Sequence, residues 1–285
     1  MSEGINAFKT LFCAAKNSPS MAFEFHKDKE RYFNMQYETT KQFILPIIEK
    51  HAKLNSDYRV LEIGCAEAGV LKAFTDFNCT CLGVELASNR LETARYFMKN
   101  EMDKGLISFM DRNIHDVDTD KDLDGKFDLV ILKDVIEHIH DQRAFVMKLK
   151  DFLKPKGLIF YAFPPWYMPF CGHQQVAQGK ITSKLPYYHL LPMPLYKGFL
   201  KAFGEPQLKI DNLVEIKQTG ISIERFEKLV KTSDFSIVER VHYLFNPIYK
   251  YKFGLTPKEQ YSAIKAIPFF RNFFTTGVYY LTKMN

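Results

Sequence analysis

One segment near residue 60 limits the possible folds of this chain more than any other. Residues 60–63 (VLEI) have the pattern of a buried strand, residues 64–69 (GCAEAG) are mostly small, and a helical pattern starts at Val70. Small residues let the backbone approach a ligand closely, and a helix N-terminus offers unpaired amide donors. Glu85 follows Gly64 by 21 residues, at the end of the next strand pattern. A carboxylate there can accept both hydroxyl hydrogens of a ribose, so the segment predicts a site for a nucleoside-containing ligand.

Two kinds of nucleoside ligand fit this arrangement. A nicotinamide dinucleotide favours G-x-G-x-x-G, because its pyrophosphate must lie against the backbone. Here Ala66 replaces the second glycine, and only Gly64 and Gly69 frame the turn. S-adenosylmethionine has no phosphate, which relaxes the demand for that glycine. The turn therefore favours S-adenosylmethionine, and a nicotinamide-dependent oxidoreductase stays open as an alternative.

Strand and helix patterns alternate through the first part of the chain. Apolar strand patterns occur at 59–63, 79–85, 106–110, 127–132 and 158–163, with helical patterns between most of them. This alternation predicts an α/β fold whose mostly parallel sheet is covered by helices on both faces. A helix is expected over Asn34–His51, and residues 1–33 are expected to form an N-terminal arm.

These segments, in this order, resemble the class I methyltransferases that use S-adenosylmethionine. Residues 60–69 resemble the first motif of that family, hhhEhGCGxG, with alanine at positions 66 and 68 where glycine is common. Residues 127–139 (FDLVILKDVIEHI) resemble its fourth strand and the following turn, and the Glu-His pair at 137–138 is typical of the ubiquinone-biosynthesis O-methyltransferase relatives. The resemblance covers about residues 35–165 well and 215–285 loosely.

The resemblance implies a Rossmann-like, seven-stranded sheet whose last strand is antiparallel. The methyltransferase domain would comprise residues 34–165 and 214–285, with a lid at 166–213 inserted between strands 5 and 6. In such enzymes Glu85 would bind the cofactor ribose, and Asn113 would contact the adenine amino group. The full set of expected cofactor-binding residues is Glu62, Gly64, Cys65, Ala66, Gly69, Glu85, Leu86, Asn113, Ile114, Lys133, Asp134 and Val135.

Residues 166–213 interrupt the α/β rhythm with prolines and aromatic side chains. A structureless segment this long inside a domain is usually a lid or a binding loop. Within it, residues 178–204 carry four lysines and no acidic residue, interleaved with leucine and aromatic residues. Such a segment can contact anionic lipid as a peripheral membrane surface, or form a helical cap packed on the sheet. It lacks arginine, which disfavours nucleic acid as the partner.

Candidate catalytic and substrate-binding residues follow strands 4 and 5. His138 and His173 are candidate general bases that would take a proton from a hydroxyl acceptor. Trp166, His173 and Gln174 are candidate substrate contacts, because ligands lie at the carboxyl ends of parallel strands. Packing or loop-stabilising roles for both histidines stay open.

Composition narrows the class of protein further. The five cysteines show neither paired CxxC nor zinc spacing, so no metal site is expected. No run of apolar residues reaches membrane-spanning length, and a cytoplasmic enzyme is expected. The sequence thus predicts methyl transfer to a small-molecule, lipid-like or glycan acceptor, most simply at oxygen. A degenerate methyltransferase fold that only binds is the second alternative, and RNA methylation rests on the net charge of +6 alone.

Overall fold

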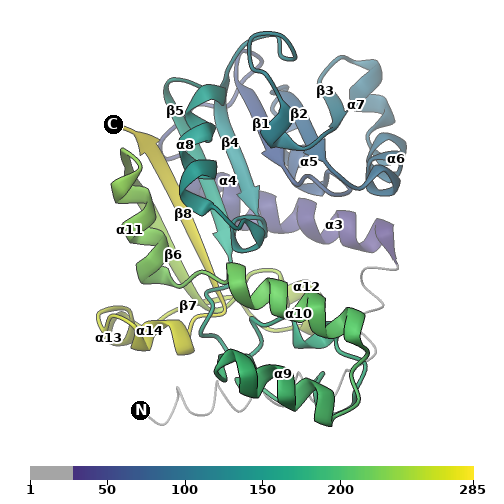
Figure 1. The fold of residues 1–285 in the computed structure, drawn as a ribbon. Helices are drawn as coiled ribbons and strands as arrows, with labels where there is room; N and C mark the ends of the chain where they lie inside the picture. Colours follow the sequence, from purple (N-terminus) through teal and green to yellow (C-terminus); the bar gives the residue numbers. More distant parts are fainter. Residues whose placement is uncertain (1–27) are drawn as a thin grey trace. The chain divides into compact units, whose positions relative to one another are not determined.

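The computed structural model describes residues 28–285 of the chain (Figure 1). Residues 1–27, which hold most of the predicted arm and Cys13, lie outside the described residues. The described chain forms two compact units. We call residues 28–163, 226–241 and 278–285 the sheet unit, and residues 164–225 and 242–277 the insert unit.

The sheet has the strand order β3-β2-β1-β4-β5-β8-β6-β7. Strands β1 to β5 are parallel, and β8 pairs antiparallel with β5, as predicted for the last strand. The predicted seven strands become eight, because the two residues Lys258 and Glu259 pair with β6 as β7. The bounds are β1 Arg59–Ile63, β2 Thr80–Glu85, β3 Ile107–Asp111, β4 Phe127–Lys133, β5 Leu153–Phe163, β6 Phe235–Phe245, β7 Lys258–Glu259 and β8 Gly277–Met284.

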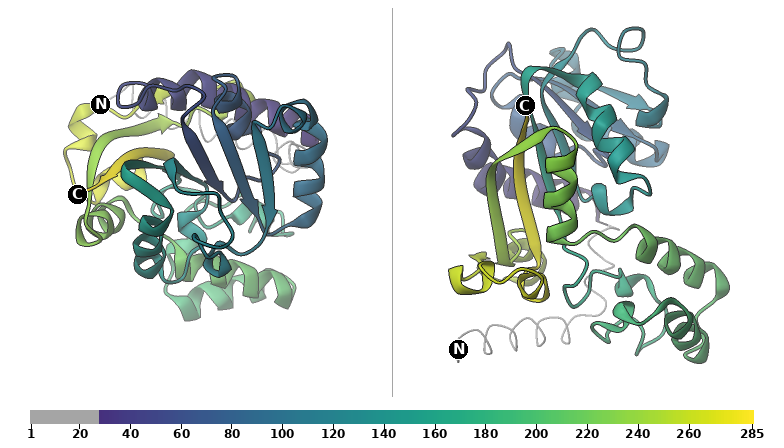
Figure 2. Two further views of the ribbon diagram at one scale, coloured as in Figure 1. Left: turned by 90° about the horizontal axis from the view of Figure 1, so that it is seen from above. Right: turned by 60° about the vertical axis from the view of Figure 1, so that its left-hand side comes forward.

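Helices cover both faces of this sheet, which confirms the predicted α/β architecture. In the sheet unit, α3 and α4 lie on one face and α8 on the other (Figure 2). The central strands β1, β4 and β5 are accordingly buried along most of their length. The bounds are α3 Lys29–Thr39, α4 Leu45–Ile48, α5 Gly69–Thr75, α6 Ser88–Phe97, α7 Lys99–Asp103, α8 Gln142–Phe152 and α11 Ile223–Thr232, with short 3₁₀ turns η2 Ile114–Asp116 and η3 Ile136–His138.

The first helix differs from the sequence prediction at its start. It begins at Lys29 rather than Asn34, because the Asp28 side chain accepts the Arg31 amide and caps the helix. Between α3 and α4 the helix widens into a π turn (η1, Thr40–Ile44), where the Leu45 amide donates to the Thr40 carbonyl. Pro46 has no amide hydrogen, so the regular hydrogen-bond pattern cannot continue at this point.

Aromatic side chains fill the core where β5 meets β8 and α11. The Phe226 ring lies 4.9 Å from the rings of both Tyr161 and Phe163, and 4.7 Å from that of Tyr280. All four side chains are almost fully buried. Many of the phenylalanine and tyrosine side chains of this chain therefore pack in the core.

The insert unit has helices and a core of its own. It contains η4 Gln174–Val176, η5 Tyr188–Leu190, α9 Met193–Ala202, α10 Gln207–Thr219, α12 Tyr249–Phe253, α13 Ser262–Lys265 and α14 Phe270–Phe273. Tyr188, Tyr196, Leu200 and Leu213 pack together in this core. No helix among residues 28–285 is long and apolar enough to cross a bilayer.

The insert unit also extends beyond the predicted lid at 166–213. Residues 214–225 and 242–277, expected in the methyltransferase domain, pack with it. Glu224 explains part of this grouping, because its carboxylate accepts the Phe269 amide, Arg271 Nε and Asn272 Nδ2 at 2.7–2.9 Å. These bonds join segments far apart in the sequence, which no local pattern reveals.

We predict that Gly69→Ala lowers the free energy of unfolding by about 1–3 kcal/mol. A Cβ atom at Gly69 would lie 2.3 Å from the Phe33 carbonyl oxygen and 2.9 Å from Gln36 Cβ, so α3 and α5 would have to separate. Urea unfolding measures the change. Gly198→Ala on α9 is the matched control, since nothing lies within 4 Å of its Cβ position. Equal stability of both variants would contradict the close helix contact.

Candidate active site

The turn after β1 has an unusual backbone. Gly64, Ala66 and Ala68 all have positive φ angles, at 73°, 51° and 67°. Only glycine adopts this region freely, so the two alanines are held there by their surroundings. A side chain at Gly64 would also lie 2.8 Å from Val135 Cγ2. Strained backbone of this kind is common where a protein presents amides to a ligand.

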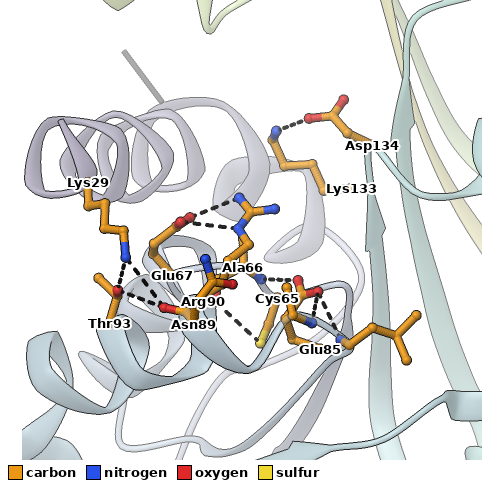
Figure 3. Close-up of polar contacts among 12 residues, drawn as sticks. Lys29, Cys65, Ala66, Glu67, Glu85, Asn89, Arg90, Thr93, Lys133 and Asp134 are labelled. Carbon is orange, nitrogen blue, oxygen red and sulfur yellow. Dashed lines mark hydrogen bonds and ion pairs between the residues drawn. The ribbon is translucent and has the colours of Figure 1, made fainter. Parts of the chain in front are cut away.

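Glu85 holds this turn in place from the end of β2. Its Oε2 accepts the Ala66 amide at 3.0 Å, and its Oε1 accepts the amides of Leu86 at 2.9 Å and Ala87 at 3.0 Å (Figure 3). Strands β1 and β2 are neighbours in the sheet, which brings the carboxylate to the turn. Helix α6 then starts at Ser88, with Ala87 at its N-cap.

A pocket lies beside the turn in the sheet unit. It is lined by side chains from α3, the end of β1, the turn, α6 and the end of β4. Glu62 forms part of its wall, is fully buried, and has an Oε2 atom without a hydrogen-bond partner. Burial raises the pKa of the Glu62 carboxyl well above its usual range. A buried polar atom without a partner is rare in proteins, and here it belongs to a residue that lines the pocket.

Two ion pairs border the pocket. Arg90 binds Glu67 through Nε at 3.1 Å and through a second nitrogen at 3.0 Å (Figure 3). Lys133 Nζ lies 2.6 Å from Asp134 Oδ2. Burial would lower the pKa of Lys133, but the Asp134 carboxylate outweighs it and the pKa stands above its ordinary value. Both cations therefore stay charged beside the pocket.

The structure brings together seven of the twelve predicted cofactor-binding residues as pocket lining: Glu62, Gly64, Cys65, Ala66, Gly69, Lys133 and Asp134. Glu85 and Val135 contact the turn without lining the pocket itself. Leu86 is exposed, Ile114 is buried, and the Asn113 side chain accepts the His115 amide. Direct cofactor contacts by all twelve residues stay a prediction.

Sequence reasoning missed a second set of pocket residues. Tyr32, Phe33 and Gln36 lie on α3, while Glu67 and Arg90 form the ion pair described above. Tyr32 and Phe33 had been assigned to the arm because the helix was expected to begin at Asn34. The Asp28 cap was the available signal, since an aspartate before Lys29-Glu30 is a typical helix start.

The predicted catalytic and acceptor residues lie in different units. His138 is an exposed residue of η3 in the sheet unit, just after β4. Trp166, His173 and Gln174 lie in the insert unit, where His173 has a left-handed backbone (φ 51°) and its Nδ1 lies 3.1 Å from the Cys171 carbonyl oxygen. Catalytic and acceptor-binding roles stay predictions.

Gln174 contributes to internal packing of the insert unit. Its Nε2 donates to the Pro169 carbonyl at 3.2 Å and to His189 Nδ1 at 2.8 Å, and both side chains are fully buried. His189 Nε2 in turn donates to the Trp166 carbonyl at 2.9 Å, which fixes the neutral tautomer. Among the described residues, no group of three or more His, Cys, Asp or Glu side chains could hold a metal ion.

Comparison with known proteins identifies the family. The model of the methyltransferase domain matches residues 32–180, which is more than half of the chain and includes β1 to β5. The chain belongs to the methyltransferase family. This confirms the predicted family and enzyme class, and S-adenosylmethionine is the cofactor of that class.

Relatives agree with the family at low identity. The methyltransferase is 25% identical over 118 residues to the ubiquinone biosynthesis O-methyltransferase of Rickettsia typhi, a match that covers 41% of this chain and 45% of the relative. The chain thus spans less than half of that relative. A methyltransferase structure from Clostridium acetobutylicum described as S-adenosylmethionine-dependent has a TM-score of 0.53 at 13% identity, covering 87% of this chain and 92% of that one. Magnesium protoporphyrin IX methyltransferase from Synechocystis with bound S-adenosylhomocysteine has a TM-score of 0.50 at 12% identity, covering 88% and 84%. These structures support the fold.

We predict that Glu85→Ala weakens S-adenosylhomocysteine binding by about 10- to 100-fold, because a hydrogen bond to a charged group contributes about 1.5–3 kcal/mol. Calorimetric titration measures it, with NADH as the comparison ligand. Glu92→Ala, an exposed carboxylate on α6, is the matched control and should bind as the wild type does. Unchanged affinity in Glu85→Ala, or binding of NADH alone, would contradict the assignment.

The buried His189 predicts a loss of stability in acid. Burial, aided by Lys217, lowers the pKa of His189 to about 4, below the ordinary value of about 6.5. The unfolded chain takes up a proton first, so stability falls as the pH drops from about 6.5 to about 4, by about 3 kcal/mol. His189→Gln can still donate to Trp166 but does not titrate. The stability gap between wild type and variant should shrink over this range, and a constant gap would refute the neutral buried histidine.

Proposed function

We propose that this methyltransferase transfers the methyl group of S-adenosylmethionine to a hydroxyl of a small-molecule, lipid-like or glycan acceptor. The observation that carries the proposal is the pocket beside the β1 turn, which Glu62 with its unpartnered oxygen helps to line, and the turn that Glu85 holds through the Ala66 amide. Methylation at oxygen is favoured by the relative described as a ubiquinone biosynthesis O-methyltransferase.

The residues of the pocket suit the cofactor. Gly64 has no side chain and Ala66 has only a methyl group, so the turn with its positive φ angles leaves room where an adenosyl group would approach. Glu85 would accept the ribose hydroxyls, and the buried Glu62 oxygen would accept from the cofactor amino group. Arg90 and Lys133 provide cations for its carboxylate. When bound, S-adenosylmethionine supplies a methyl group that its sulfonium already makes electrophilic.

Positioning is therefore the main task of the protein. An activated methyl group needs an aligned acceptor oxygen and a site that excludes water, more than a strong base. His138 and His173 are the candidate bases for the hydroxyl proton. His138 follows β4 directly, and His173 holds a strained backbone after β5, a feature that often marks functional positions.

We also propose that residues 178–204 bring the enzyme to a lipid-like acceptor or to the membrane surface that contains it. This segment has lysine as its only charged side chain, and Leu195 on α9 is 61% exposed. The enzyme would then work at the cytoplasmic face of a membrane. An acceptor that carries an isoprenoid or acyl chain would be concentrated there.

We predict methyl transfer from S-adenosylmethionine to hydroxylated acceptors and not to amines. If a histidine is the base, its alanine variant should lower kcat by about 10²- to 10⁴-fold with little change in cofactor affinity. Release of S-adenosylhomocysteine with a panel of catechols, hydroxylated quinols and glycan precursors would measure both the acceptor preference and kcat. His140→Ala, an exposed neighbour of His138, is the control. Cofactor binding without transfer to any hydroxyl compound would favour the binding-module alternative.

A further inference from the structure

The exposed apolar side chains of this enzyme are concentrated in the insert unit. Of the eleven large hydrophobic side chains that are exposed among residues 28–285, eight belong to it. Five of these lie within residues 181–208: Ile181, Leu185, Leu195, Phe203 and Leu208. Leu208 is 72% exposed, and it lies beyond the segment that the sequence had suggested. We call the exposed side chains of residues 180–208 the apolar-basic surface.

Glu205 joins the loop at residues 178–182 to the end of α9. Its carboxylate accepts the Gln178 amide at 3.0 Å, the Gly179 amide at 2.8 Å and the Thr182 hydroxyl at 2.5 Å. Its own amide donates to the Leu200 carbonyl of α9 at 3.1 Å. The loop that carries Lys180 and Ile181 is thereby held against the end of α9, close to Phe203. The same bonds turn the Glu205 charge inward, since this residue is 6% exposed.

Helix α9 presents one face without acidic residues. Tyr196 and Leu200 are buried in the insert core, which fixes the rotation of the helix. The exposed positions of α9 are consequently Pro194, Leu195, Lys197, Gly198, Lys201 and Ala202, which are small, apolar or basic.

The lysines of the surface form no ion pair with residues 28–285. Among the described residues, no carboxylate lies within ion-pair distance of Lys180, Lys184, Lys197 or Lys201. The insert unit as a whole carries 12 lysine and arginine residues against 5 acidic ones. Unpaired lysine side chains among exposed leucine and phenylalanine side chains suit a partner with a negatively charged surface layer and an apolar layer below it.

We propose that the apolar-basic surface binds the interface of an anionic phospholipid bilayer. The apolar side chains would enter the headgroup region while the lysine amines stay beside the lipid phosphates. The inference deepens the lipid contact proposed above and rests on it. The proposed partner is a bilayer, the binding surface includes the first turn of α10, and Glu205 is the residue that holds the parts of this surface together. Each lysine near such a membrane should raise partitioning about fivefold.

The test is flotation of the full chain with two kinds of vesicle, pure phosphatidylcholine and an equal mixture with phosphatidylglycerol. The wild type should float with the mixed vesicles, weakly or not at all with phosphatidylcholine, and less at high salt. Lys197→Gln with Lys201→Gln should lower binding to the mixed vesicles about 25-fold. Leu195→Ser with Phe203→Ser should also lower binding to the mixed vesicles, without changing how that binding depends on salt.

Matched controls lie in the sheet unit. Lys104→Gln with Lys126→Gln removes the same charge from exposed positions there, and Tyr96→Ser with Met147→Ser removes exposed apolar side chains. Both control pairs should float like the wild type. Equal loss in the controls, no flotation of the wild type, or binding that ignores salt would overturn the proposal.

Two further readouts separate this inference from its alternatives. A single-stranded RNA oligonucleotide should not bind. If it binds in a way that depends on the four lysines but not on Leu195 and Phe203, the partner of this surface is nucleic acid and not a membrane. Calorimetry with S-adenosylhomocysteine should give wild-type affinity in every surface variant. If cofactor binding and flotation persist while no hydroxyl acceptor is methylated, the proposed reaction fails and the membrane surface stands.

Discussion

The carboxylate of Glu85 is the contact on which the turn after β1 and the start of α6 depend. It accepts three backbone amides, one from the turn after β1 and two from the segment that leads into α6. Hydrogen bonds to a charged acceptor are stronger than neutral ones, so they can hold Ala66 in a conformation that alanine avoids. Helix α6 consequently starts where Arg90 can reach Glu67 across the pocket. One side chain thus links the turn, the helix and the pocket wall.

The sheet could be predicted from the sequence because its strands are buried on both faces. Runs such as residues 129–132 are apolar without interruption, which is typical of a parallel sheet covered by helices on both faces. The turn after β1 was also predictable, since small residues follow directly on a strand. The start of α3 was not, because Tyr32 and Phe33 face the pocket wall rather than continuing an obvious apolar stripe. Their role depends on contacts with residues far away in the sequence.

The insert was harder to predict because a proline can indicate either the interruption of a helix or its start. Proline interrupts a helix from inside but suits its first turn, where no amide partner is lost. Pro192 and Pro206 stand directly before α9 and α10, so two residues that looked like breaks mark helix starts. The buried faces of these helices, Tyr196 with Leu200 and Ile210 with Leu213, then form the local core. Closely spaced prolines masked a helical pattern that is present.

The two units differ in charge. The sheet unit carries 26 acidic and 24 basic residues, and the two cations that line its pocket, Arg90 and Lys133, are paired with the carboxylates of Glu67 and Asp134. The insert unit has the opposite sign, with exposed apolar side chains between its cations. The proposed cofactor site and the proposed membrane surface are therefore built from separate residues, so substitutions can test one without removing the other.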